Sequence, residues 1–128
     1  MKKIKFIVQK EDIGYSATSE LGDVFIGTDG TTYEELLSNI AEATNLAFEE
    51  EGTKYNLDDI RFEYDLTSFF HFYKVINVKA LSERIGMNQS LLAQYIGGYK
   101  TPSPSQTKRI LLGVHQIGKE LSEVSFLF

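Results

Sequence analysis

The sequence contains no cysteine and no apolar run long enough to cross a membrane. Without thiols the chain forms neither a disulfide framework nor a thiolate metal site, which fits a reducing compartment. A membrane span takes roughly 20 apolar residues. The first apolar run already ends at Val8, which is too short for a secretory signal. We therefore expect a soluble, cytoplasmic protein without a membrane partner.

Acidic residues are scarce in the second half of the chain. Residues 66–128 hold 3 acids against 7 bases, a net charge of +4, whereas residues 1–65 hold 15 acids against 6 bases, a net charge of −9. Such an asymmetry indicates that the two halves meet different partners. A small excess of one sign is also common in ordinary domains, so the charge split alone identifies neither partner.

The sequence also lacks a recognisable catalytic or metal-binding constellation. No histidine lies in residues 1–65 to act as a base, and neither His71 nor His115 has a neighbouring ligand residue. The carboxylates of the first half that might form a metal set lack the spacing of ligands: Asp23, Asp29, Glu42 and Asp65. We expect no enzyme activity, no metal and no cofactor, and we expect these acids to lie in solvent or to meet a basic partner.

In the first half of the chain, the apolar residues have the spacing of β-strands and then the spacing of a helix. Residues 3–10 alternate and place Ile4, Phe6 and Val8 on one face, which predicts a strand. Three more strands are predicted, at residues 14–18, 24–26 and 60–64. Asp29-Gly30 is predicted to be a turn, and the capping-box spacing of Thr32 and Glu35 predicts a helix that ends at Gly52.

The second half has the period of several short helices. Residues 66–73 have apolar side chains at helical spacing, but their aromatic density also suits a strand that continues from Tyr64. Asn77 and Asn88 are good N-caps for helices at 78–85 and 89–96, and Gly86 is suited to the left-handed end of the first. Ser103 and Pro104 open a last helix. Its expected apolar stripe is Ile110, Leu111, Val114, Ile117 and Leu121.

These elements predict an α+β fold of two domains. Residues 1–64 form a small sheet domain of order β-β-β-α-β, and residues 65–128 form an all-α domain with a helix-turn-helix.

The helix predicted at 89–96 has one face without any charge. On a helical wheel Leu91, Leu92, Tyr95 and Ile96 oppose a polar face of four residues: Gln89, Ser90, Ala93 and Gln94. A solvated face more often uses Lys and Glu. Glutamine can form two hydrogen bonds with adenine, serine can form a hydrogen bond with either kind of base, and alanine can contact the thymine methyl group. Carboxylates at these positions would be repelled by the phosphates. The pattern is typical of a recognition helix in the DNA major groove.

The flanking residues extend this predicted DNA-binding surface. Asn88 precedes the helix, and Tyr99, Lys100 and Thr101 follow it with groups suited to phosphate contacts. Lys108 and Arg109, near the start of the last helix, are also expected to approach the DNA backbone. A homodimer or higher oligomer would place two recognition helices about 34 Å apart. The alternative is a helical bundle whose surface is merely polar.

Residues 78–106 resemble the helix-turn-helix of the lambda-repressor-like (XRE) class. The resemblance lies in the run from Leu81 to Ser90, above all its Gly-x-x-Gln-Ser step, and in five later positions: Leu92, Tyr95, Ile96, Gly98 and Pro102. It implies that Gln89 contacts adenine, that Ser90 and Gln94 face base edges, and that Asn88 and Lys100 approach the DNA. Gly97 stands where that class frequently has asparagine.

Residues 1–64 resemble the N-terminal domain of HicB-family antitoxins, which is a partial ribonuclease-H-like fold without nuclease activity. The matching residues are Gly14-Tyr15-x-Ala17 and a helical pattern of Thr32, Glu35, Leu36, Asn39, Glu42 and Ala43. The resemblance implies a type II antitoxin that binds operator DNA and sequesters a small basic HicA-like ribonuclease. The charge split is compatible with both partners.

Two other functions stay open at this point. One is a stand-alone transcriptional regulator whose first domain binds a ligand or only dimerises. The other is a nuclease, which would need a carboxylate constellation that the sequence does not show.

Overall fold

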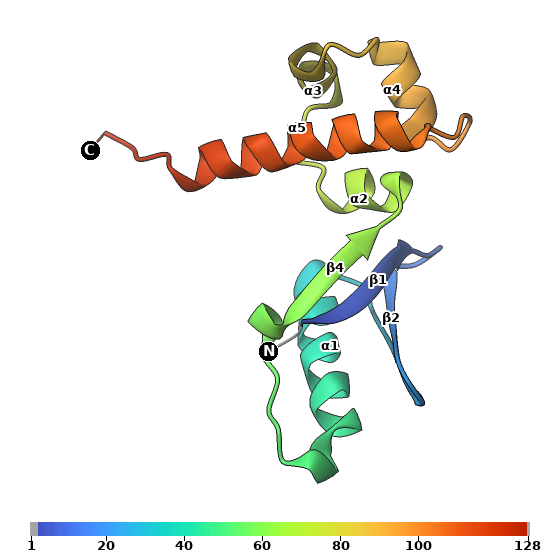
Figure 1. The fold of residues 1–128 in the computed structure, drawn as a ribbon, viewed down its shortest axis with the longest axis vertical. Coiled ribbons are helices and arrows are strands. Elements are labelled where there is room, and N and C mark those ends of the chain that lie inside the picture. Colours follow the sequence, from blue (N-terminus) through green and yellow to red (C-terminus); the bar gives the residue numbers. More distant parts are fainter. Residues whose placement is uncertain (1–2, 128) are drawn as a thin grey trace. The chain divides into compact units, whose positions relative to one another are not determined.

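The computed structural model describes residues 3–127 and divides the chain into two compact units. We call Met1–Phe72 the sheet unit and Tyr73–Phe128 the helical unit, and each is described by itself (Figure 1). The chain is therefore of mixed α and β composition, with a four-stranded sheet in the sheet unit, and this coarse expectation is confirmed.

The sheet unit is built on four strands in the order β3-β2-β1-β4. The strands are β1 (Ile4–Lys10), β2 (Tyr15–Leu21), β3 (Val24–Gly30) and β4 (Ile60–Tyr64). β2 is antiparallel to β1 and β3, and β4 is parallel to β1, with Phe62 beside Phe6. The predicted alternation of β1 is confirmed, because Ile4, Phe6 and Val8 are buried.

Helix α1 (Tyr33–Ala47) covers one face of this sheet. The Thr32 Oγ1 atom accepts a hydrogen bond from the Glu35 N–H at 3.2 Å, as the capping pattern predicted. Leu36 and Ile40 are fully buried against the sheet core, to which Phe48 also belongs. The helix ends at Ala47 and not at Gly52, because Phe48 leaves the helical conformation, and a short 3₁₀ turn, Glu49–Glu51, follows.

The dipeptide Asp29-Gly30 is not a turn, so that prediction was wrong. Asp29 pairs with Ser16 and Gly30 pairs with Tyr15 in the ladder between β2 and β3. A Cβ atom on Gly30 would lie 2.5 Å from the backbone nitrogen of Leu36. Glycine is needed there because the first turn of α1 passes directly over the strand.

Residues 66–72 form a helix, α2 (Leu66–Phe72), and it belongs to the sheet unit. The Lys10 N–H donates a hydrogen bond to Ser68 Oγ at 2.9 Å, and the Tyr15 hydroxyl and His71 Nδ1 are 2.6 Å apart. Phe72 packs edge-on against Tyr15 with ring centroids 4.6 Å apart, and burial raises the pKa of Tyr15. By their contacts the two units divide between residues 72 and 73.

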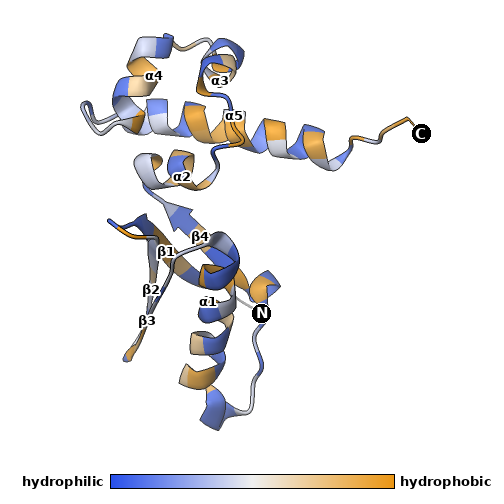
Figure 2. Cartoon of the chain, turned by 180° about the vertical axis from the view of Figure 1, so that it is seen from behind, coloured by the Kyte–Doolittle hydropathy of each residue, from blue (hydrophilic) through white to orange (hydrophobic). Residues whose placement is uncertain are grey.

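The helical unit consists of α3 (Val78–Ile85), α4 (Gln89–Ile96) and α5 (Pro104–Ser122). Its buried apolar side chains come from all three helices and the turn: Leu81, Met87, Leu92 and Ile110. The stripe predicted on α5 is only partly inward. Leu111 is 50% exposed and Leu121 is 67% exposed, because they lie on another side of α5 than Arg109, Gly113 and Glu120, which contact α3. Figure 2 shows the hydrophobic bands along α5.

Candidate nucleic-acid interface

Helices α3 and α4 are joined by a three-residue turn that side chains hold at both ends. Asn77 Oδ1 caps α3 by accepting the Ala80 N–H at 2.9 Å. Gly86 takes the left-handed conformation at φ 67°, and the Met87 N–H donates to the Ser82 carbonyl. The Met87 side chain is buried, so the turn is anchored in the core of the helical unit.

Arg109 on α5 forms hydrogen bonds with the C-terminal end of α3. Its Nε atom donates to the Ile85 carbonyl at 2.8 Å, and its Nη2 atom donates to the Gly86 carbonyl at 2.9 Å. These carbonyls have no partner within an α-helix, so a charged donor satisfies them well. Arg109 therefore positions the turn, whereas the sequence had suggested an approach to DNA.

A close approach of α5 to α3 makes this contact possible. A Cβ atom on Gly113 would lie 2.4 Å from Ile85 Cγ2, so the small residue lets the two helices pack tightly. The sequence alone did not indicate this role for Gly113 or Arg109. The only signal was their four-residue spacing on one side of the helix, and the carbonyls that Arg109 binds lie 23 and 24 residues away in the sequence.

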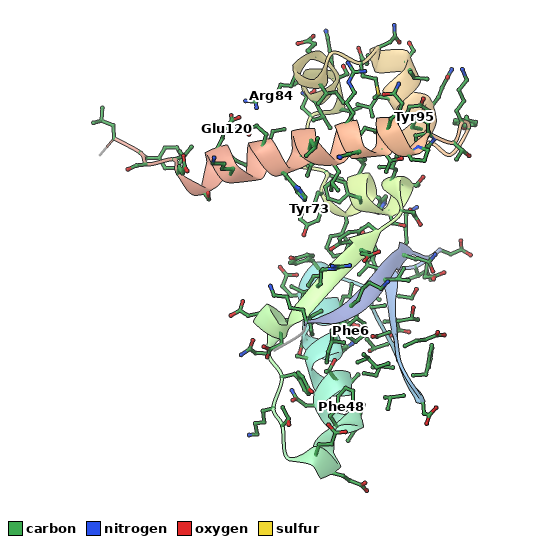
Figure 3. All side chains as sticks on the ribbon, in the orientation of Figure 1. Phe6, Phe48, Tyr73, Arg84, Tyr95 and Glu120 are labelled. Carbon is green, nitrogen blue, oxygen red and sulfur yellow. The ribbon has the colours of Figure 1, made fainter. Side chains whose placement is uncertain are left out.

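A second contact between α3 and α5 pairs the positive charge of another arginine with a carboxylate. Arg84 and Glu120 form a double hydrogen bond at 2.9 and 2.8 Å, and the two side chains point toward one another in Figure 3. The hydrogen bonds from Arg84 and then from Gln116 lower the pKa of Glu120 from its ordinary 4.5 to about 2. Both arginines of the helical unit thus serve its packing, and lysines supply its remaining positive charge.

Helix α4 presents the uncharged face that the wheel predicted. Four side chains of the predicted DNA-binding set are exposed on it: Gln89, Ser90, Ala93 and Gln94. On the opposite side Leu92 is fully buried, and Leu91, Tyr95 and Ile96 are partly buried. Asn88 caps the helix, since its Oδ1 atom accepts the N–H groups of Ser90 at 2.8 Å and Leu91 at 3.2 Å. Its amide nitrogen keeps the donor character that a phosphate requires.

The segment after α4 has a defined backbone. The Gln94 carbonyl accepts the N–H groups of Tyr99 at 2.9 Å and of Lys100 at 3.2 Å, and Gly98 is left-handed at φ 79°. The side chains of Tyr99, Lys100 and Thr101 are all exposed beside the end of α4. The structure thus gathers the predicted set, residues 88–101, on one helix and its two flanks.

The glycine at position 97 is explained by the packing of a neighbouring side chain. A Cβ atom there would lie 2.7 Å from Cε2 of Tyr99, so the tyrosine ring rests on the bare glycine backbone while staying 85% exposed. An asparagine at this position would displace the ring. The glycine at position 97 therefore allows the Tyr99 ring to lie at the edge of the candidate interface.

The part of the chain that the structure describes holds no group of three or more histidine or carboxylate side chains suited to a metal ion. None of its helices has both the length and the apolar character that a bilayer span requires.

Comparison with protein-family models, with curated proteins and with solved structures finds no match to this chain.

Proposed function

We propose that the helical unit binds operator DNA through α4 as a helix-turn-helix and that the chain is a HicB-like antitoxin. In this proposal it is a binding protein of the cytoplasm and not an enzyme. It represses its own operon and neutralises a small basic ribonuclease of the HicA type.

The observation that carries the DNA-binding part is the exposed, uncharged face of α4. Gln89 and Gln94 offer amides that pair with adenine edges in the major groove, and neither glutamine is engaged by a side-chain contact that the structure records. Lys100 and Thr101 stand beside this face, where a duplex would bring its phosphates. A helix that served only solubility would carry acids or lysines on this face.

The antitoxin part is supported by the resemblance of residues 1–64 and by the charge of the sheet unit. Its net charge of −9 attracts a basic RNA-binding protein and accelerates the encounter. The uncovered face of the sheet also carries apolar side chains that are partly free, with Ile7 43% exposed and Phe25 64% exposed. Exposed aromatic side chains such as Phe25 are enriched at the centre of protein-binding surfaces, and charged residues around them suit the polar rim.

The DNA-binding part is tested by titrating the labelled 128-residue chain with duplexes of its own promoter and following its backbone amides by NMR. We expect the largest shifts at residues 88–101 and small shifts in the sheet unit. Shifts confined to the sheet unit, or none at all, would refute the assignment of α4.

The antitoxin part is tested by mixing the 128-residue chain with a small basic protein from a neighbouring gene and measuring the affinity as a function of salt concentration. We expect binding that weakens steeply with salt and loss of ribonuclease activity in the mixture. If the chain retards its promoter but binds no such protein, it is a stand-alone transcriptional regulator.

A further inference from the structure

Strand β3 is an edge of the sheet, and no further strand lies beside it in the part of the chain that the structure describes. It pairs with β2 alone. A two-residue turn joins the two strands, and hydrogen-bonded pairs alternate along them from Leu21 and Val24 onward. The peptide groups of Phe25, Gly27 and Asp29 therefore face away from β2.

Helix α1 covers one end of this edge and leaves the rest open. Asn39 Nδ2 donates a hydrogen bond to the Asp29 carbonyl at 2.8 Å, which agrees with a peptide group that points away from β2. The outward peptide groups of Phe25 and Gly27 have no partner among the described residues, and both residues are exposed. We call residues 24–28 the β3 edge.

The opposite edge of the sheet is protected against further pairing. Strand β4 has only five residues, and Glu63 lies 2.7 Å from Arg61 Nη2 and 3.8 Å from Lys5 Nζ. Short edge strands and charged side chains discourage the addition of another strand. Strand β3 has seven residues and lacks lysine and proline, and its Phe25 side chain is 64% exposed. Only the β3 edge is thus suited to take another strand.

The surroundings of the β3 edge are acidic throughout. Residues 11–53, which include β2, β3 and α1, hold eleven acids and no lysine, arginine or histidine. The bases of the sheet unit lie on or before β1, in the segment before β4 and on β4. Two copies of this acidic edge would repel one another, whereas a basic segment would be attracted.

Large apolar side chains lie on both sides of the β3 edge. On the outer face, a Cβ atom on Gly27 would be 3.1 Å from Phe25 Cε1, so the aromatic ring lies beside the bare glycine. On the other face α1 packs on β3. Glu42 and Leu46 follow Asn39 by three and seven residues and share its side of α1. Leu46 is 70% exposed.

We propose that the β3 edge binds an extended segment of a partner protein by strand addition, and that this segment combines lysine or arginine with apolar residues. The peptide groups of Phe25 and Gly27 supply main-chain hydrogen bonds, and successive side chains of the added strand lie toward Phe25 and toward Leu46 in turn. The edge is defined by its own chemistry. Only the identity of the partner rests on the proposed function, which would make it the ribonuclease.

The probe is an eight-residue peptide in which lysine alternates with valine, added to the isotope-labelled 128-residue chain. We expect the amide hydrogen exchange of Phe25 and Gly27 to slow by about tenfold or more, because their N–H groups become hydrogen-bonded. Binding should weaken as salt is added. The same peptide with N-methyl groups on alternate residues keeps its charge and loses its donors, so it should bind about tenfold more weakly.

A pair of charge variants tests the position of the site. Glu42→Lys places a base beside the β3 edge and should weaken peptide binding several-fold. Asp58→Lys makes the same change of charge in the turn before β4, at the opposite edge, and should bind the peptide nearly as the wild type does. Equal losses in both variants would show that only the net charge attracts the peptide and would overturn the proposal.

Three further results would overturn strand addition at β3. The first is equally tight binding of the N-methylated peptide, and the second is exchange protection confined to β4. The third is protection of Phe25 and Gly27 in the peptide-free chain that grows with protein concentration, because a second copy would then cover the edge.

The outcome for the edge is separate from the outcome for the antitoxin. If the peptide protects Phe25 and Gly27 but no basic ribonuclease binds the chain, the β3 edge stands and the antitoxin part falls. If a ribonuclease binds while neither it nor the peptide protects these amides, the antitoxin part stands and the β3 edge falls.

Discussion

The two units of this chain are stabilised in different ways. The sheet unit has an apolar core in which Phe6, Val8, Leu36 and Ile40 are fully buried between the sheet and α1 (Figure 3 labels Phe6). The helical unit buries few large side chains and relies on caps and on arginines that join α3 to α5. The polar contacts of the helical unit join α3 to α5 and do not involve the exposed face of α4. That face therefore stays accessible to a binding partner.

The largest effect is expected where the sheet unit depends on its core. Phe6→Ala should destabilise that unit by about 3–5 kcal/mol, because it leaves a cavity between the sheet and α1. Urea unfolding should show this loss in a transition of the sheet unit. Phe25→Ala on the exposed sheet face is the control and should change stability by less than about 1 kcal/mol. Equal effects of both variants would contradict the described core.

The same variant separates the two units functionally. If each unit folds by its own contacts, Phe6→Ala should leave promoter binding by the helical unit nearly intact. A parallel loss of DNA binding would show that the units fold as one.

A smaller effect is expected on the free face of α4. Gln89→Ala should weaken binding to the promoter by about 1–3 kcal/mol and should affect random DNA much less. Fluorescence anisotropy with both duplexes measures the difference. Gln9→Ala, which removes an exposed glutamine of the sheet unit, is the control. An equal loss on both duplexes would contradict a base-contacting role.

Arg109→Ala tests the polar stabilisation of the helical unit. Hydrogen bonds to charged groups contribute about 1.5–3 kcal/mol, and the exposure of Arg109 reduces this, so we expect a loss of about 1–2 kcal/mol in stability. Specific DNA binding should fall with it, with an unchanged salt slope, because Arg109 contacts carbonyls and not phosphates. Lys108→Ala, the neighbouring variant, should leave the stability unchanged. A reduced salt slope for Arg109→Ala would instead indicate a phosphate contact.

Lys100→Ala should change the salt dependence of DNA binding and not the stability, the opposite of the result expected for Arg109→Ala. Its stability should match that of the wild type, and its affinity should fall on promoter and random DNA alike. The salt slope should drop by about one unit if Lys100 neutralises one phosphate. An unchanged slope would remove Lys100 from the interface.

The smallest effect concerns the pH dependence of the Arg84–Glu120 contact. The pKa of Glu120 is lowered to about 2 in the folded state, so the ionised carboxylate stabilises the fold above its ordinary pKa of 4.5. This contribution is lost as the pH falls from about 4.5 through 2. Glu120→Gln should lose stability at neutral pH and show less further loss in that acidic window. Thermal unfolding from pH 7 to pH 2 compares the two proteins.

Local patterns made much of this fold predictable. The alternation of β1, the caps at Asn77 and Asn88 and the left-handed Gly86 depend on neighbours within a few residues, and the structure shows each of them. The exposed face of α4 followed from helical spacing in the same way.

Contacts between distant residues were not predictable from such patterns. Gly30 allows the close approach of α1, Ser68 joins α2 to β1 across 58 residues, and Arg109 binds carbonyls 23 and 24 residues away. Each of these depends on which elements pack together, and no local period carries that information. The exposure of Leu111 and Leu121 has the same cause, because α3 packs on another side of α5.

The central claim is that the uncharged face of α4 binds base edges of duplex DNA. Its most direct test is the affinity of the wild-type chain for its own promoter and for a scrambled duplex of equal length and composition, measured at low and at moderate salt. We predict tighter binding to the promoter, with a preference that persists as salt weakens both complexes. No binding at low salt, or equal affinity for the two duplexes, would contradict the claim.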